Sequence, residues 1–162
     1  MKGFVIVIAI AAVVYFGFLR SDRFDVPISV NGTTYSLNKE VETHGLTNYF
    51  YTPEGKDTRG IIEWVQLFVY DDDFPDDTRI EVKNKALEKY NLQSLKADDT
   101  LYFGLYSAKG ITAAGFGSDI RIDGRPALVL YFYPVDSEEE QKDAKRTAET
   151  IDLELKRTAE QL

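Results

Sequence analysis

Apolar and polar residues alternate on both sides of two short turn sequences, which predicts two β-hairpins. The first covers residues 26–37 around Asn31-Gly32, and the second covers residues 118–135 around Asp123-Gly124. Asn-Gly and Asp-Gly accept the positive φ angles that a two-residue type I′ turn requires. Each sequence therefore indicates a tight antiparallel connection.

The second hairpin also predicts which side chains share a face. Direct pairing across its turn sets Ile122 opposite Arg125 and Ile120 opposite Ala127. One face then collects Ile120, Ile122, Ala127, Val129, Tyr131 and Tyr133, and the other face carries Leu128, Leu130 and Phe132. Because both sets are apolar, the far part of the long strand is expected to be buried on both sides.

Three further segments are rich in β-branched and aromatic residues, a composition typical of strands. They cover residues 46–52, 61–70 and 100–107. Residues 111–117 are small and flanked by glycine, and this pattern fits either a strand or a loop.

Two segments have a helical period of apolar residues, and each begins with a capping-box sequence. The first runs over about residues 77–91 with Thr78-x-x-Glu81 near its start, and its inner side is expected to hold Ile80, Val82, Ala86, Leu87 and Tyr90. The second begins at Ser137, with Glu140 three residues on, and can continue to Leu162. Its apolar stripe is Ala144, Ala148, Ile151, Leu155, Ala159 and Leu162.

This order of strands and helices predicts an α+β fold. We expect a mostly antiparallel sheet with two helices packed on one of its faces. Without an internal linker or repeat, residues 26–162 are expected to form a single domain.

Residues 4–19 contain no charged side chain, which predicts one N-terminal transmembrane helix within an anchor at residues 1–20. Residues 21–25 then form a tether. A cleaved signal is the main alternative, but its small-x-small sequence at Ala9-Ile10-Ala11 lies too early in the apolar segment. A third interpretation of residues 4–19 is a helix buried in the core of the protein. An N-terminal anchor usually exports the domain, so a single-pass protein with a periplasmic domain is expected.

Charge and composition restrict the chemistry of the domain. The chain has net charge −8, and residues 1–20 hold two basic side chains, Lys2 and Arg20, so the remainder carries −10. A negative surface repels nucleic acid and anionic headgroups. The absence of Cys and the single His44 exclude thiolate and multi-histidine metal sites. We therefore expect neither a metal nor another cofactor.

The densest group of ionisable residues is the acidic run at residues 71–77. It contains five carboxylates, Asp71, Asp72, Asp73, Asp76 and Asp77. The spacing does not match an EF-hand, because the sixth position lacks Gly and the twelfth is Val82. The run is either a solvated loop whose last Asp residues cap the following helix or a charged surface that binds a partner.

Aromatic residues make up 13% of the chain, and adjacent aromatics such as Tyr49, Phe50 and Tyr51 point to opposite faces of a strand. Tyr49 and Tyr51 are therefore either exposed interface residues or strand formers that pack inside. We include them with the acidic run as candidate partner-binding residues.

The remaining motifs are explained by structural roles rather than by catalysis or ligand binding. No nucleophile elbow accompanies His44, which fits an ordinary loop histidine. The glycines between Lys109 and Asp119 match no phosphate-binding loop and predict a tight turn or a bulged strand. Asn31-Gly-Thr33 fits a glycosylation sequon, although a hairpin turn explains it equally well.

These observations predict a membrane-anchored acidic domain that binds a basic protein partner. It is expected to be an accessory subunit of a cell-envelope complex or an immunity or inhibitor protein, and not an enzyme. One alternative is a domain that carries a small apolar or lipid-like ligand. The other is a hydrolase that uses two carboxylates, from among Glu63, Asp119 and the run at 71–77.

Overall fold

The computed structural model describes residues 24–54 and 62–162. Within these two ranges no helix combines the length and the apolar character that crossing a bilayer requires. The predicted anchor at residues 1–20, with its apolar segment 4–19, lies outside the described residues. Membrane attachment and the export of the domain therefore stay predictions.

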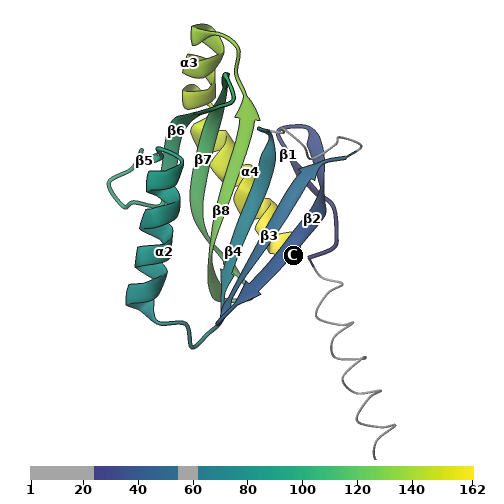
Figure 1. Ribbon diagram of the computed structural model, residues 1–162, viewed down its shortest axis with the longest axis vertical. Coiled ribbons are helices and arrows are strands. Elements are labelled where there is room, and N and C mark those ends of the chain that lie inside the picture. Colours follow the sequence, from purple (N-terminus) through teal and green to yellow (C-terminus); the bar gives the residue numbers. More distant parts are fainter. Residues whose placement is uncertain (1–23, 55–61) are drawn as a thin grey trace, which may run out of the picture.

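Eight strands form one antiparallel sheet in the order β1-β2-β3-β4-β8-β7-β6-β5 (Figure 1). Every neighbouring pair is antiparallel, as the turn sequences indicate. The strands are β1 Ile28–Val30, β2 Thr33–Thr43, β3 Leu46–Pro53, β4 Trp64–Tyr70, β5 Gln93–Ser94, β6 Leu101–Ala108, β7 Ile111–Ile122 and β8 Arg125–Pro134. The mixed α+β class is confirmed, with the sheet dominant.

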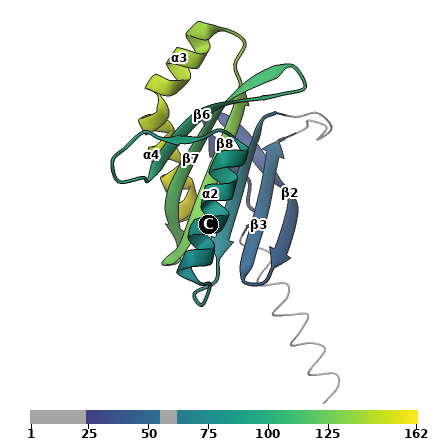
Figure 2. The same cartoon turned by 60° about the vertical axis from the view of Figure 1, so that its left-hand side comes forward.

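Within the described ranges three helices cover this sheet, and they lie on both of its faces (Figures 1 and 2). They are α2 Asp76–Lys89, α3 Glu138–Arg146 and α4 Ala148–Gln161. Helix α2 packs on the face that carries Leu128, Leu130 and Phe132, whereas α3 and α4 pack on the face that carries Val129 and Tyr131. The expectation that the helices share one face was wrong, because a strand that is apolar on both sides needs cover on both sides.

Both predicted hairpins are confirmed. Asn31 and Gly32 have φ angles of 51° and 74°, and Asp123 and Gly124 have 51° and 78°, as a type I′ turn requires. Ile122 pairs with Arg125 and Ile120 with Ala127 in the expected register.

Two more connections use the same geometry. His44-Gly45 joins β2 to β3, and Lys109-Gly110 joins β6 to β7, with positive φ at all four residues. His44 is therefore an exposed turn residue, in agreement with the loop reading.

Of the two structures predicted for the glycines between Lys109 and Asp119, the tight turn is present at Lys109-Gly110 and the bulge is not. Strand β7 pairs with β6 and β8 without a shift in register. A Cβ atom on Gly104 would lie 2.0 Å from the backbone oxygen of Asn91, and one on Gly115 would lie 2.5 Å from the Phe132 ring. These two glycines let the chain that leaves α2 pass directly over the sheet.

The structure confirms the capping residue predicted at Ser137 but not the one predicted at Thr78. Helix α2 begins after Pro75 without a side-chain cap, so the box at Thr78 is wrong, and Ile80 is 49% exposed. At the second helix, the Oγ of Ser137 accepts a hydrogen bond of 3.2 Å from the backbone N–H of Glu140. The helix is interrupted at Thr147, but every residue of its predicted apolar stripe is buried.

The sheet is strongly curled around the core beneath α4. Tyr35 on β2 and Tyr131 on β8 are three strands apart, a separation of about 14 Å in a flat sheet. Their ring centroids nevertheless lie 5.9 Å apart and their hydroxyl oxygens 3.3 Å apart. This core also includes Phe24, which is buried, so the folded part of the chain extends into the predicted tether at residues 21–25.

Candidate functional site

The acidic run forms the connection from β4 to α2, at the end of the molecule opposite α3 (Figure 1). Asp71 is half-buried, and the other four carboxylates are exposed. Asp76 and Asp77 lie in the first turn of α2, where negative charge is favourable near the helix N-terminus. Asp72 and Asp73 precede the helix and have no such structural role.

This acidic loop is held in place by backbone contacts and by one aromatic side chain. The backbone N–H of Asp71 donates to the carbonyl of Gly45 at 2.8 Å, and that of Phe74 donates to the carbonyl of Asp71 at 3.0 Å. The Phe74 ring packs against Tyr70 with 5.1 Å between centroids. The carboxylates are therefore presented from an anchored loop.

Only part of the charge of the loop is neutralised within the described part of the chain. Asp71 lies 3.7 Å from the guanidinium of Arg125, and Asp76 lies 2.9 Å from that of Arg79. Asp72, Asp73 and Asp77 form no ion pair with another described residue. The described residues also contain no group of three or more His, Asp or Glu side chains arranged to hold a metal ion.

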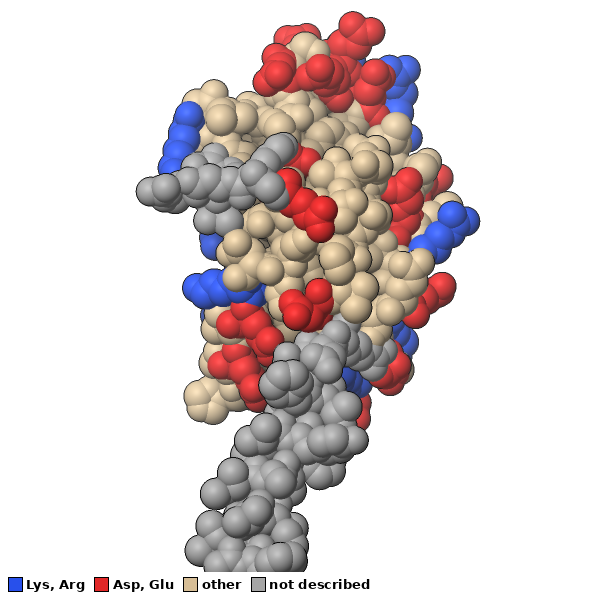
Figure 3. Space-filling view, turned by 90° about the vertical axis from the view of Figure 1, so that its right-hand side faces the viewer, with Lys and Arg blue, Asp and Glu red and all other residues tan. Residues whose placement is uncertain are grey.

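A second acidic group lies at the opposite end of the molecule, around α3 (Figure 3). It includes Glu138, Glu139 and Glu140 in the first turn of that helix. There the charges stabilise the helix dipole, and Glu140 also accepts a hydrogen bond of 2.6 Å from the backbone N–H of Asp136. This group has a structural explanation that Asp72 and Asp73 lack.

Tyr49 and Tyr51 lie in the core and are not part of the surface. They are 6% and 0% exposed. The ring of Tyr49 stacks on Phe24 at 4.2 Å between centroids, and the hydroxyl of Tyr51 donates to the Phe24 carbonyl at 2.8 Å. Burial raises the pKa of Tyr51 well above its ordinary value. We therefore leave both tyrosines out of the candidate surface.

The carboxylates considered for hydrolysis do not form a facing pair. Glu63 accepts a hydrogen bond of 2.9 Å from the Tyr35 hydroxyl on the face that α4 covers. Asp119 points to the opposite face, where it pairs with Lys83 of α2 at 2.9 Å. Between α4 and the sheet there is a void of about 10 Å³ beside Leu155, so this part of the interior is filled by side chains.

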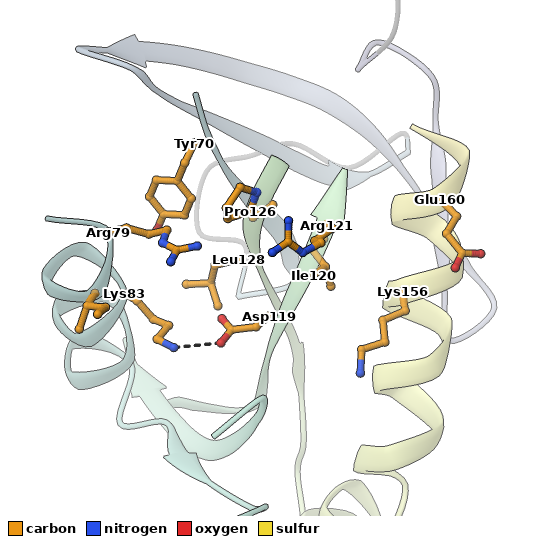
Figure 4. A pocket seen from close by; sticks show the side chains of 12 residues that line it. Tyr70, Arg79, Lys83, Asp119, Ile120, Arg121, Pro126, Leu128, Lys156 and Glu160 are labelled. Atoms are coloured by element: carbon orange, nitrogen blue, oxygen red, sulfur yellow. Dashed lines mark hydrogen bonds and ion pairs between the residues drawn. The ribbon is translucent and has the colours of Figure 1, made fainter. Parts of the chain in front are cut away.

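A larger cavity, of about 460 Å³, opens at the end of β7 between α2 and α4 (Figure 4). Strand β6 starts at Leu101 opposite Ser118, so the last residues of β7 run beyond β6. The cavity was not predicted, because its lining residues come from five elements, β4, α2, β7, β8 and α4, and form no motif in the sequence.

Charged side chains surround this cavity. Helix α2 contributes Arg79 and Lys83, and β7 contributes Asp119 and Arg121. Burial lowers the pKa of Lys83, but its hydrogen bonds, first of all the one to Asp119, outweigh burial and leave the pKa raised. Lys83 is therefore charged, and it neutralises Asp119.

Comparison with known proteins found no family model, curated protein or solved structure that matches this chain. We therefore infer its function from the geometry and charge of the acidic loop and the cavity.

Proposed function

We propose that this chain is a membrane-anchored protein that binds a basic protein partner through its acidic loop, Asp71–Asp77. The observation that supports this proposal best is the state of Asp72 and Asp73. They are exposed, they belong to an anchored loop, they have no ion-pair partner among the described residues, and no helix start explains them.

Anchoring of the loop favours binding. A loop already held by Gly45 and Phe74 loses little conformational entropy when a partner docks. Repulsion among close carboxylates is relieved when basic side chains approach them. The net charge of the domain also attracts a basic partner over a distance, which speeds association more than it adds affinity.

The proposed setting is a membrane surface outside the cytoplasm. Attachment through residues 4–19 would confine the domain to two dimensions and raise its effective concentration toward other membrane proteins. An accessory subunit of an envelope complex and an immunity or inhibitor protein both fit this arrangement.

The proposal is tested by neutralising the two unexplained carboxylates in the full-length protein. The double variant Asp72→Asn/Asp73→Asn is compared with Glu138→Gln/Glu139→Gln, which removes the same charge at the opposite end of the molecule. Each protein is cross-linked in native membranes at low and high salt, and the captured partner is quantified. We expect the loop variant to recover about threefold to tenfold less partner at low salt, since exposed ion pairs each contribute roughly 0.2–1 kcal/mol.

The control variant should capture as much partner as the wild type. High salt should reduce capture by the wild type to the level of the loop variant. Equal losses in both double variants, or capture that salt does not affect, would show that the acidic loop is not the docking surface.

A further inference from the structure

Basic side chains outnumber acidic ones among the residues that line the cavity between α2 and α4, although the chain as a whole is acidic. Four basic side chains line it, Arg79, Lys83, Arg121 and Lys156, against the two acidic side chains of Asp119 and Glu160. Basic side chains are therefore in excess along this lining in a chain of net charge −8. This composition makes the cavity distinct from the acidic loop.

The two arginines retain most of their hydrogen-bonding capacity. Lys83 is paired with Asp119 at 2.9 Å, and Lys156 is paired with the buried Asp152 at 2.8 Å. Arg121 donates to the backbone carbonyl of Gly124 at 2.5 Å and forms no ion pair within the described ranges. The Asp76 side chain that pairs with Arg79 is 82% exposed, so water screens that pair.

A buried hydroxyl without a partner also lines the cavity. Tyr70 is 2% exposed, and its hydroxyl has no hydrogen-bond partner among the described residues. Burial and, to a smaller extent, the charge of Asp119 raise the pKa of Tyr70, Arg79 lowers it, and the net result is a pKa of about 12. The hydroxyl is therefore a neutral donor among the charged groups of the cavity, and in Figure 4 its ring lies beside Arg79.

The structure also gives a second buried polar atom without a hydrogen-bond partner among the described residues, but the residue that carries it does not line the cavity. The Nε1 of Trp64 is also buried without a partner. Its indole is enclosed by Phe132, Tyr90 and Tyr106, whose ring centroids lie 4.5 to 6.3 Å away, and Trp64 lines neither this cavity nor the small void beside Leu155. Of these two residues, Tyr70 alone lines a cavity and lies near cations.

Apolar side chains complete the walls. Ile80, Pro126 and Leu128 line the same space. A volume of about 460 Å³ is within the range of small-molecule sites. A ligand that fits it needs an acceptor for a phenolic hydroxyl, negative charge for two guanidinium groups, and an apolar body.

We infer that this cavity binds a small organic molecule that carries one oxyanion group, a carboxylate or a phosphate. Arg79 and Arg121 bind the oxyanion, the Tyr70 hydroxyl donates to one of its oxygens, and the apolar walls hold its carbon skeleton. The planar guanidinium group can bind either a carboxylate or a phosphate through two hydrogen bonds. The experiment below determines which of the two the cavity binds. This site goes beyond the proposed partner binding and does not depend on it.

The inference is tested by calorimetric titration of the full-length protein in a neutral detergent. The probes are phenyl phosphate, benzoate and the uncharged benzyl alcohol. We expect at least one of the two anions to bind at least tenfold more tightly than benzyl alcohol, and the tighter of the two identifies the oxyanion. The test variants are Arg121→Gln and Tyr70→Phe, and the matched control is Arg146→Gln, which removes one exposed arginine on α3.

Arg121→Gln should weaken binding of the preferred anion about tenfold or more, and Tyr70→Phe about threefold to tenfold, because each removes a hydrogen bond to a charged group. The control should bind as the wild type does. Tyr70→Phe removes a hydroxyl that has no acceptor among the described residues, so this variant should fold normally, as checked by circular dichroism. The inference is overturned if neither anion binds better than benzyl alcohol, or if folded Tyr70→Phe and Arg121→Gln bind the anion unchanged.

Discussion

At the scale of single residues, Asp152 is the least expected feature of the core. It lies on α4, is 3% exposed, and accepts a hydrogen bond from the buried Oγ of Ser118 on β7. Its other oxygen lies 2.8 Å from the ammonium of Lys156. A buried carboxylate is costly unless it is fully partnered, and here each oxygen has its own donor.

We predict that Asp152→Ala destabilises the protein by about 2–4 kcal/mol. The substitution leaves the buried Ser118 hydroxyl without an acceptor and Lys156 without its partner. Urea unfolding followed by circular dichroism measures the loss.

Glu149→Ala on the same helix is the matched control. Glu149 is exposed and lies 3.7 Å from Lys96, so its loss should change stability by less than about 0.5 kcal/mol. A loss at Asp152 as small as the control's would contradict a stabilising role for this network.

At the scale of elements, two similar sequences at helix starts behave differently. Ser137 caps α3, whereas Thr78 is the third residue of α2 and does not cap it. Pro75 is the N-cap residue of α2 and Asp76 is the first helical residue, so the helix begins before Thr78. A capping-box pattern identifies a helix start only when no stronger signal precedes it.

We predict that Ser137→Ala costs about 1 kcal/mol of stability, because the N–H of Glu140 loses its acceptor. Thr78→Ala should change stability by less than about 0.5 kcal/mol, since this exposed side chain makes no cap. Thermal unfolding of both variants under identical conditions measures the difference. Equal losses at the two positions would show that Thr78 contributes to the start of α2.

Local chemistry explains why some elements could be predicted and others could not. Asn31-Gly32 and Asp123-Gly124 were recognised because Asn-Gly and Asp-Gly are preferred dipeptides of type I′ turns, whereas His44-Gly45 and Lys109-Gly110 adopt the same turn with dipeptides outside that set. The apolar stripe of α4 was predicted in full from its period.

The candidate site was predictable only where it is continuous in sequence. The acidic loop is a single run and was recognised directly. The cavity joins Tyr70, Arg79, Arg121 and Lys156, and the pairing of strands in space brings them together. The alternation of Tyr49 and Tyr51 placed them on one face of β3, but only the curl of the sheet determines that this face is buried.

At the scale of the whole molecule, the curled sheet depends on tyrosines that remain neutral. Tyr35 and Tyr131 meet across the concave side, and Tyr51 is buried beside them in the same core. Burial raises the pKa of Tyr131 to about 12 and raises that of Tyr35 further. Ionisation of either tyrosine would place a charge in the centre of the core.

We therefore predict cooperative unfolding at alkaline pH. In the unfolded chain a tyrosine titrates near pH 10, while in the folded protein Tyr70 and Tyr131 titrate near 12. The unfolded state thus loses protons first. The stabilisation is fully present below pH 10 and is lost as pH rises through about 12, at roughly 2–3 kcal/mol for each of these two tyrosines.

Ultraviolet absorbance of tyrosinate and far-ultraviolet circular dichroism, recorded on the same samples, measure this transition. The buried tyrosines should ionise only together with the loss of the sheet. Ionisation of all ten tyrosines in one step near their ordinary pKa, with the sheet retained, would contradict the packing of this core. Such a result would mean that water reaches Tyr35 and Tyr131, and therefore that α4 does not close the concave face in solution.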